Sequence, residues 1–264
     1  MAREDPQIIP PELLLRAYRA GIFPMADSRD DPELYWVEPR MRAILPLDEF
    51  HLSKSLARTL RRGRFTVTCN AAFDAVIDSC AAPRLDAEES WISTRIRESY
   101  RALHRDGHAH SIETWAHNEN GRDRLVGGLY GVGFDRVFCG ESMFSRESDA
   151  SKVALAWLVA ALRRAGATLL DCQFTTPHLA SLGAVEIPQS QYLGLLDEAM
   201  DDGPYRAGAA GSAAAGASGA GDDAGAAAFA GLPAGFAALL ADAAEAGLSS
   251  SPGNFIAQSL THTS

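Results

Sequence analysis

Asp171 and Gln173 are the residues of this chain whose types and spacing most directly suggest chemistry. They stand two positions apart in the apolar run 167–174. If this run is a strand, alternate side chains share a face, so the two would be neighbours with Cα atoms about 6.5 to 7 Å apart. Burying a carboxylate and a carboxamide without partners is costly. The spacing fits a hydrogen-bonded pair in the core as well as a pair in an active site.

Glu141 raises the same question in a second apolar run, residues 137–144. It follows Gly140 directly, and a glycine inside a strand pattern indicates a bulge. A buried glutamate must be paired or protonated. Both the structural and the functional interpretation stay open for this residue.

Metal and nucleophile signatures are weak in this sequence. His108 and His110 have the i, i+2 spacing of two ligands on a strand, but no third His, Cys or carboxylate is tied to them by spacing, so ordinary core or surface histidines are predicted. The four scattered cysteines form no C-x-x-C pair, which predicts reduced thiols and no structural metal site. The glycines of residues 125–133 lack the G-x-G-x-x-G spacing, so we expect close backbone packing in a sheet there.

The elements that must position these residues follow from periodicity and end signals. A helix is predicted over residues 11–20, with proline in its first turn and Gly21 at its end. Residues 23–25 and 35–40 are assigned to a loop. Asp149 or Ser148 is expected to cap the helix 149–164, and Gly166 to end it. The other predicted elements are helices over 51–64, 71–81, 92–105 and 191–200 and strands over 65–68, 109–117, 125–134, 136–144 and 167–174. This order predicts an α+β fold.

Composition bounds the class of protein. The 264 residues carry a formal net charge of −10 and 47% hydrophobic residues, enough for one good core and a smaller second one. No run approaches the roughly 18 to 20 apolar residues of a membrane span, and the first residues lack a signal-peptide pattern. We therefore expect a cytoplasmic protein with no membrane contact. The acidic balance argues against nonspecific coating of nucleic acid.

Two segments depart from the average composition. The predicted helix 51–64 carries five basic residues and no acidic one, for which a solvated helix face is the simpler interpretation. Residues 207–231 are almost wholly Ala, Gly and Ser, which predicts a flexible linker. A short docked helix is expected to begin at Phe236. The chemistry should therefore lie before residue 200.

Eight short motifs, taken together and in this order, are specific enough to indicate a protein family. They are Gly21-Ile-Phe-Pro24, Trp36-x-x-Pro39-Arg40, Gly107-His-Ala-His-Ser-Ile-Glu113, Gly127-Gly-Leu-Tyr-Gly131, Phe138-Cys-Gly-Glu-Ser-Met-Phe-Ser145, Ala150-Ser-Lys152, Leu170-Asp-Cys-Gln173 and His178-Leu-Ala-Ser-Leu-Gly-Ala184. Together they closely resemble the leucyl/phenylalanyl-tRNA–protein transferase family, from about residue 10 to residue 200. The Ala/Gly tail lies outside the shared pattern.

The resemblance implies a fold and an activity. A small N-terminal α/β domain, residues 1–62, would precede a GNAT-like acyltransferase domain, residues 63–203, and a linker and tail, residues 204–264. The enzyme would move Leu or Phe, and Met less well, from aminoacyl-tRNA to the N-terminal amine of proteins that begin with Arg or Lys. Its product would enter the N-degron pathway of protein degradation. The family uses no metal or redox cofactor, and we expect a monomer.

The resemblance also gives the polar candidates catalytic roles. An aminoacyl ester is already activated, so the enzyme mainly aligns an amine with the ester carbonyl and manages protons. The Gln173 oxygen can accept a hydrogen bond from the amine, while Asp171 orients it or takes the proton. Glu141 would hold the α-ammonium of the aminoacyl group.

Apolar and aromatic positions complete the implied substrate site. The pocket for the transferred side chain would be lined by Leu129, Phe138, Leu155, Leu158 and Leu170. Strict alternation places Phe138 and Glu141 on opposite faces, so a shared pocket requires a bulge near Gly140.

Recognition of the tRNA is implied at two places. Trp91 and Tyr100 match positions near the terminal adenosine, where an aromatic face can stack on the base. At Met25 some relatives carry a tryptophan, so half of an aromatic sandwich differs here. The basic residues Lys54, Arg58, Arg61 and Arg62 would contact the acceptor-stem backbone.

Two other functions compete with this one. An acyl-CoA-dependent N-acetyltransferase of the same fold would want a glycine-rich pyrophosphate loop, which residues 146–152 lack. A non-catalytic tRNA-binding module would keep the basic helix and the aromatic residues but has no need of Asp171 and Gln173.

Overall fold

A computed structural model of the chain describes residues 8–31, 33–83, 90–117, 123–201 and 231–261. Its centre is a seven-stranded mixed sheet in the order β4-β5-β6-β7-β8-β3-β9. The strands are β3 (Met41–Ile44), β4 (Thr66–Cys69), β5 (Ala109–His117), β6 (Asp123–Phe134), β7 (Val137–Ser145), β8 (Leu169–Gln173) and β9 (Val185–Pro188). Neighbours pair antiparallel except β7 and β8, which are parallel. The observed fold is α+β, as predicted.

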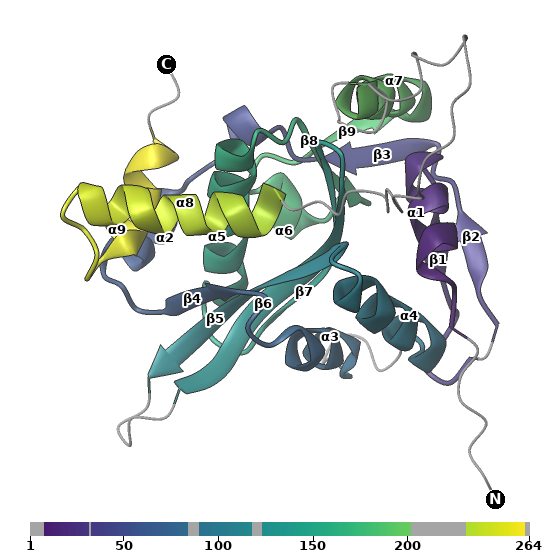
Figure 1. Ribbon diagram of the computed structural model, residues 1–264, viewed down its shortest axis with the longest axis horizontal. Coiled ribbons are helices and arrows are strands. Elements are labelled where there is room, and N and C mark those ends of the chain that lie inside the picture. The colour runs from purple at the N-terminus through teal and green to yellow at the C-terminus, as the bar shows by residue number, and fades with distance from the viewer. Residues whose placement is uncertain (1–7, 32, 84–89, 118–122, 202–230, 262–264) are drawn as a thin grey trace, which may run out of the picture.

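Helices cover both faces of the sheet and enclose two cores (Figure 1). The helix α5 (Ala150–Ala165) connects β7 to β8 and packs on one face, with α2 (Lys54–Arg61) beside it. The other face carries α1 (Pro11–Arg19), α3 (Phe73–Ala81), α4 (Thr94–Arg105) and α7 (Gln189–Asp201). A parallel pair needs such a crossover, so α5 fixes where β7 and β8 lie next to each other. Glu141 and Asp171 lie on these two strands.

The predicted helices and long strands are confirmed, with ends shifted by a few residues. Four short strands were missed: residues 23–25 and 35–37, assigned to a loop, form the two-stranded sheet of β1 (Phe23–Met25) and β2 (Tyr35–Val37), and β3 and β9 join the large sheet. Strands of three or four residues carry only a weak signal, and of these short strands only β4 was predicted, over 65–68. The short helix α6 (Pro177–Ala180) was missed for the same reason.

The capping of α5 differs from the prediction. Asp149 occupies the N-cap position, but its side chain makes no capping hydrogen bond and its φ is 68°. Its carboxylate accepts from the Thr59 hydroxyl at 3.3 Å instead, while Ser145 accepts from the Ser151 backbone N–H at 3.2 Å. Gly166 ends the helix in the left-handed region, as predicted.

The expected domain boundary between residues 62 and 63 separates segments that share one sheet. Strand β3 precedes the boundary, yet it pairs with β8 on one side and β9 on the other. The C-terminal segment docks on the same body: α8 (Gly231–Glu245) packs against α5, and α9 (Pro252–Ser259) packs against α2. The docked helix expected at Phe236 is therefore confirmed. The linker was predicted over residues 207–231; residues 207–230 lie outside the described residues, and Gly231 begins α8.

The bulge predicted near Gly140 is present. Tyr130 pairs with Ser142 and Gly131 with Gly140, so Glu141 is an extra residue on β7 without a partner on β6. Such a residue escapes the strict alternation of the strand. The bulge turns Glu141 toward the interior described below.

Gly131, opposite this bulge, is expected to tolerate no side chain. A Cβ there would overlap the Cys139 carbonyl and the Phe138 ring, whereas at Gly140 the nearest atom would be 3.6 Å away. Overpacking of this kind typically costs about 1 to 3 kcal/mol. Thermal unfolding should therefore show a lower Tm for Gly131→Ala than for Gly140→Ala. Equal Tm values would contradict the close packing at Gly131.

Candidate active site

A cavity of about 840 Å³ lies between β7, β8, the first half of α5 and the residues that precede α4. Four leucines predicted to form an apolar pocket, Leu129, Leu155, Leu158 and Leu170, line it. Glu141 and Gln173 line the same cavity. The fold thus places one carboxyl and one carboxamide beside an apolar surface.

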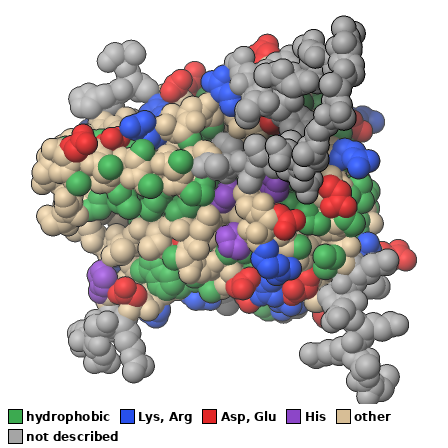
Figure 2. All heavy atoms as spheres, viewed as in Figure 1, with side chains coloured by type: hydrophobic (Ala, Val, Ile, Leu, Met, Phe, Trp, Pro, Cys, Tyr) green, Lys and Arg blue, Asp and Glu red, His purple; other side chains and the backbone are tan. Residues whose placement is uncertain are grey.

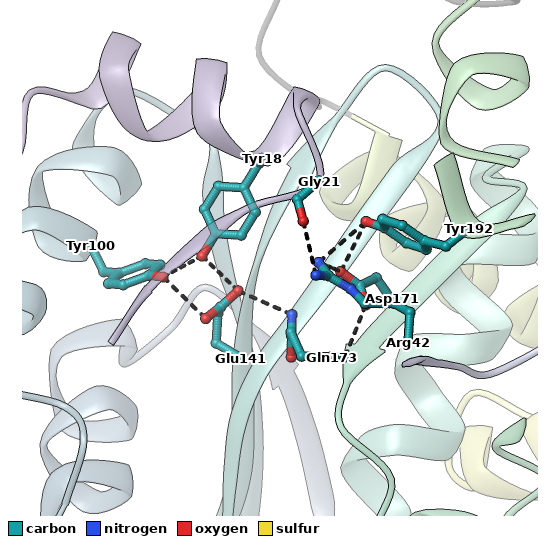
Figure 3. Close-up of polar contacts among 8 residues, drawn as sticks. All are labelled: Tyr18, Gly21, Arg42, Tyr100, Glu141, Asp171, Gln173 and Tyr192. Carbon is teal, nitrogen blue, oxygen red and sulfur yellow. Dashed lines mark hydrogen bonds and ion pairs between the residues drawn. The ribbon is translucent and has the colours of Figure 1, made fainter. Parts of the chain in front are cut away.

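Glu141 is held by two tyrosines from different helices (Figure 3). The Tyr18 hydroxyl of α1 donates to Oε1 at 2.7 Å, and the Tyr100 hydroxyl of α4 donates to Oε2 at 3.0 Å. The two hydroxyls also contact each other. Burial raises the pKa of Glu141 from 4.5 to about 7, although the hydrogen bonds from both tyrosines oppose the rise. This carboxyl therefore changes its charge near neutral pH.

Asp171 forms a buried ion pair with Arg42, a residue of β3 (Figure 3). Arg42 Nε donates to Oδ1 at 2.9 Å and Nη2 to Oδ2 at 2.5 Å, while Nη1 donates to the Gly21 carbonyl. The guanidinium lies against the rings of Phe23 and Tyr192. Arg42 and Asp171 are 1% and 0% exposed. The Asp171 charge is fully paired inside the protein.

Gln173 links the ion pair to Glu141. Its backbone N–H donates to Asp171 Oδ1 at 2.8 Å, and its Nε2 donates to Glu141 Oε1 at 3.4 Å. Its φ is 56°, in the left-handed region that non-glycine residues rarely adopt. A rare backbone conformation of this kind persists only where its surroundings enforce it. The Asp171 hydrogen bond supports it here.

The expected side-by-side arrangement of Asp171 and Gln173 is wrong. Asp171 does not line the cavity, whereas Leu170 and Cys172 do, so the Asp171 side chain projects from the other face of β8. The left-handed backbone at Gln173 breaks the alternation and turns its side chain to the cavity. Asp171 therefore contacts Gln173 through its backbone: its carboxylate accepts the hydrogen bond from the Gln173 N–H.

The remaining site candidates divide into three groups. Trp91 and Met25 line the cavity. Phe138 and Tyr100 are fully buried and do not line it: Phe138 packs in the core with the four leucines, and Tyr100 presents no open face for a base. The basic residues Lys54, Arg58, Arg61 and Arg62 lie outside the cavity, on a separate groove.

Three side chains that contact Glu141 or Asp171 were not predicted from the sequence. Arg42 stands as a charge inside the short run 41–46, a signal that could have been noticed. Tyr18 and Tyr192 occupy buried positions of helices, where a tyrosine has no distinguishing pattern. Among the described residues, no group of three or more His, Cys, Asp or Glu side chains is placed to hold a metal. None of the described helices has the length and apolar character that crossing a bilayer requires.

The fold and the cavity define an α+β protein with a binding site suited to an amino acid, because a carboxyl able to hold an amine adjoins a leucine-lined surface. The family model for leucyl/phenylalanyl-tRNA protein transferase matches residues 44–197, and the model for the N-terminal domain of these transferases matches residues 8–40. The chain belongs to the leucyl/phenylalanyl-tRNA–protein transferase family, as the motifs predicted.

Curated relatives carry the same name. A leucyl/phenylalanyl-tRNA–protein transferase of Novosphingobium aromaticivorans is 73% identical over the whole of both chains. Those of Rhizorhabdus wittichii and Zymomonas mobilis are each 58% identical over 73% of this chain, covering 75% and 70% of their own lengths. A solved structure titled "Crystal structure of FemX" has a TM-score of 0.45 and 13% identity, covering 67% of this chain and 66% of that one.

Proposed function

We propose that this protein moves Leu or Phe, and Met less well, from aminoacyl-tRNA to the N-terminal amine of proteins that begin with Arg or Lys. The product would enter the N-degron pathway in the cytoplasm. The family is named for transfer from leucyl- or phenylalanyl-tRNA to protein. The observation that carries the proposal is the leucine-lined cavity with Glu141 and Gln173 on its wall. In this proposal residues 63–203 form the GNAT-like catalytic domain and residues 1–62 the N-terminal domain, with the shared β3 joining them.

The proposal gives the aminoacyl group one orientation in the cavity. Its side chain would contact Leu129, Leu155, Leu158 and Leu170, and its α-ammonium would bind the ionised Glu141. An apolar pocket separates side chains that differ by a methylene or two by only about 1 to 3 kcal/mol. Such a site accepts Leu, Phe and Met. Trp91 and Met25, on the same cavity, would contact the terminal adenosine.

Gln173 is placed to position the attacking amine. Its Nε2 is engaged by Glu141, so its carbonyl oxygen is the atom left to accept a hydrogen bond from the acceptor amine. The neutral amine forms a C–N bond with the ester carbonyl carbon, the C–O bond to the ribose breaks, and an amine proton ends on the leaving ribose oxygen. Asp171 is a positioning residue, because Arg42, Tyr192 and the Gln173 N–H occupy its oxygens.

The test is transfer of labelled leucine from leucyl-tRNA to a peptide that begins with Arg. Label should reach the Arg-initiated peptide and not an otherwise identical peptide that begins with Glu. A parallel reaction supplies labelled acetyl-CoA without tRNA and should give no product. Acetyl transfer would contradict the proposal in favour of an N-acetyltransferase. Tight tRNA binding without any transfer would instead indicate a non-catalytic tRNA-binding module.

A further inference from the structure

The C-terminal helices α8 and α9 lie outside the residues that the family models match, yet they are built into the fold. Two glycines allow α8 and α9 to pack closely against α5 and α2. A Cβ at Gly235 would overlap the Ala161 carbonyl of α5, and one at Gly253 would overlap the Leu60 carbonyl of α2. Ile256, Ala257 and Leu260 join the same core as Leu60. The extension therefore contacts the end of the basic helix directly.

This contact creates a groove of about 460 Å³ with cations along it. It is lined by Lys54, Arg58, Arg61 and Arg62 of the α2 segment and by Thr261, which follows α9. All four cations are exposed, and within the described part of the chain none of them forms an ion pair with a carboxylate. The extension thus supplies a wall to the groove without neutralising it.

The charge pattern of the extension indicates the kind of occupant. Residues 246–264 contain no Asp or Glu, although the whole chain holds 34 acidic residues and has a net charge of −10. The neighbouring α8 has two carboxylates, Asp242 and Glu245, and neither lines the groove; Asp242 is engaged by Arg164 of α5. Figure 2 shows mainly apolar and uncharged atoms over the visible face of the extension. An extension that occupied the basic groove in place of a nucleic acid would need carboxylates, and residues 246–264 have none.

We propose that the C-terminal extension forms part of the tRNA-binding surface, with Thr261 on one wall of a groove that holds the phosphate backbone. This inference rests on the proposed function, since it takes the acceptor stem of the aminoacyl-tRNA as the occupant. Phosphate contacts fix the position of a nucleic acid without reading its sequence. A second wall limits where the backbone can lie beside α2, so the extension helps to place the acceptor end near the cavity.

Charge changes at Thr261 test the proposal, because this exposed side chain lies outside the catalytic cavity. Thr261→Glu should raise the KM for leucyl-tRNA on the order of tenfold at low salt and leave kcat unchanged. Thr261→Lys should lower this KM and steepen its dependence on salt by about one unit of log–log slope. A gain in affinity cannot come from partial unfolding. Ala237→Glu, an exposed site on α8 outside the groove, provides the matched control and should behave as the natural protein does.

A substrate without phosphates separates this inference from the proposed function. Transfer from a leucyl ester of adenosine should be the same in all four proteins, because it does not reach the groove. If the KM for leucyl-tRNA is equal in Thr261→Glu, Thr261→Lys and Ala237→Glu, the inference is overturned while the proposed function stands. If the natural protein transfers leucine from neither substrate, the proposed function itself fails.

Discussion

An Asp171→Ala variant is expected to lose nearly all transfer activity and about 3 to 5 kcal/mol of unfolding free energy. The variant leaves the Arg42 guanidinium buried, 1% exposed, without its carboxylate. It also removes the acceptor of the Gln173 N–H, which supports the left-handed backbone at that residue. Denaturant unfolding measures the loss of unfolding free energy, and the leucine transfer assay measures the loss of activity.

A double variant separates stability from activity. Replacing both Arg42 and Asp171 with leucine removes both buried charges, so part of the lost stability should return. Activity should not return, because Gln173 still lacks the group that holds its backbone. Asp106→Ala is a suitable control, since this residue is exposed, has an ordinary φ of −81° and lies outside the cavity. A stable, active Asp171→Ala protein would contradict the role assigned to the ion pair.

Glu141→Gln is expected to weaken binding of the aminoacyl group by about 10- to 150-fold, because it loses one charge-assisted hydrogen bond of roughly 1.5 to 3 kcal/mol. The measurement is the affinity for a stable leucyl-amide analogue of the tRNA terminus. A binding experiment is needed because turnover also depends on deprotonation of the acceptor amine, whose ordinary pKa is about 7.7 to 8. Glu186→Gln, at an exposed strand position, should bind as the natural protein does.

The pH dependence of this binding has a definite sign. Burial raises the pKa of Glu141 to about 7, so below pH 7 the carboxyl is neutral and cannot pair with an ammonium. Affinity should therefore fall as the pH drops through about 7 in the natural protein and stay nearly flat in Glu141→Gln. Between pH 4.5 and about 7, Glu141 keeps its proton in the folded protein but releases it in the unfolded chain. The free energy of unfolding should therefore decrease as the pH rises through this range. A parallel pH profile in both proteins would exclude Glu141 as the binding group.

The sequence by itself determined the elements whose pattern is local. The helices 11–19 and 150–165 show their periodicity and end signals directly, and the long strands stand out as runs separated by turn signals such as Asn118-Glu-Asn-Gly121. The bulge near Gly140 was predicted because the family resemblance placed Phe138 and Glu141 in one pocket. The bulge is present, although Glu141 lines the cavity and Phe138 does not. Glu141 and Gln173 stood out as polar residues in apolar runs, and both line the cavity.

Only the tertiary structure decided how these groups work together. Arg42 and Asp171 are 129 residues apart, and they meet because a four-residue strand inserts between β8 and β9. The left-handed backbone at Gln173, which cancels the alternation of β8, depends on a hydrogen bond to a carboxylate that this pair holds in place. Tyr18 and Tyr100 reach Glu141 from two different helices, and Gly253 brings α9 onto α2. Such contacts join residues far apart in the chain, and their energies depend on burial that no local pattern encodes.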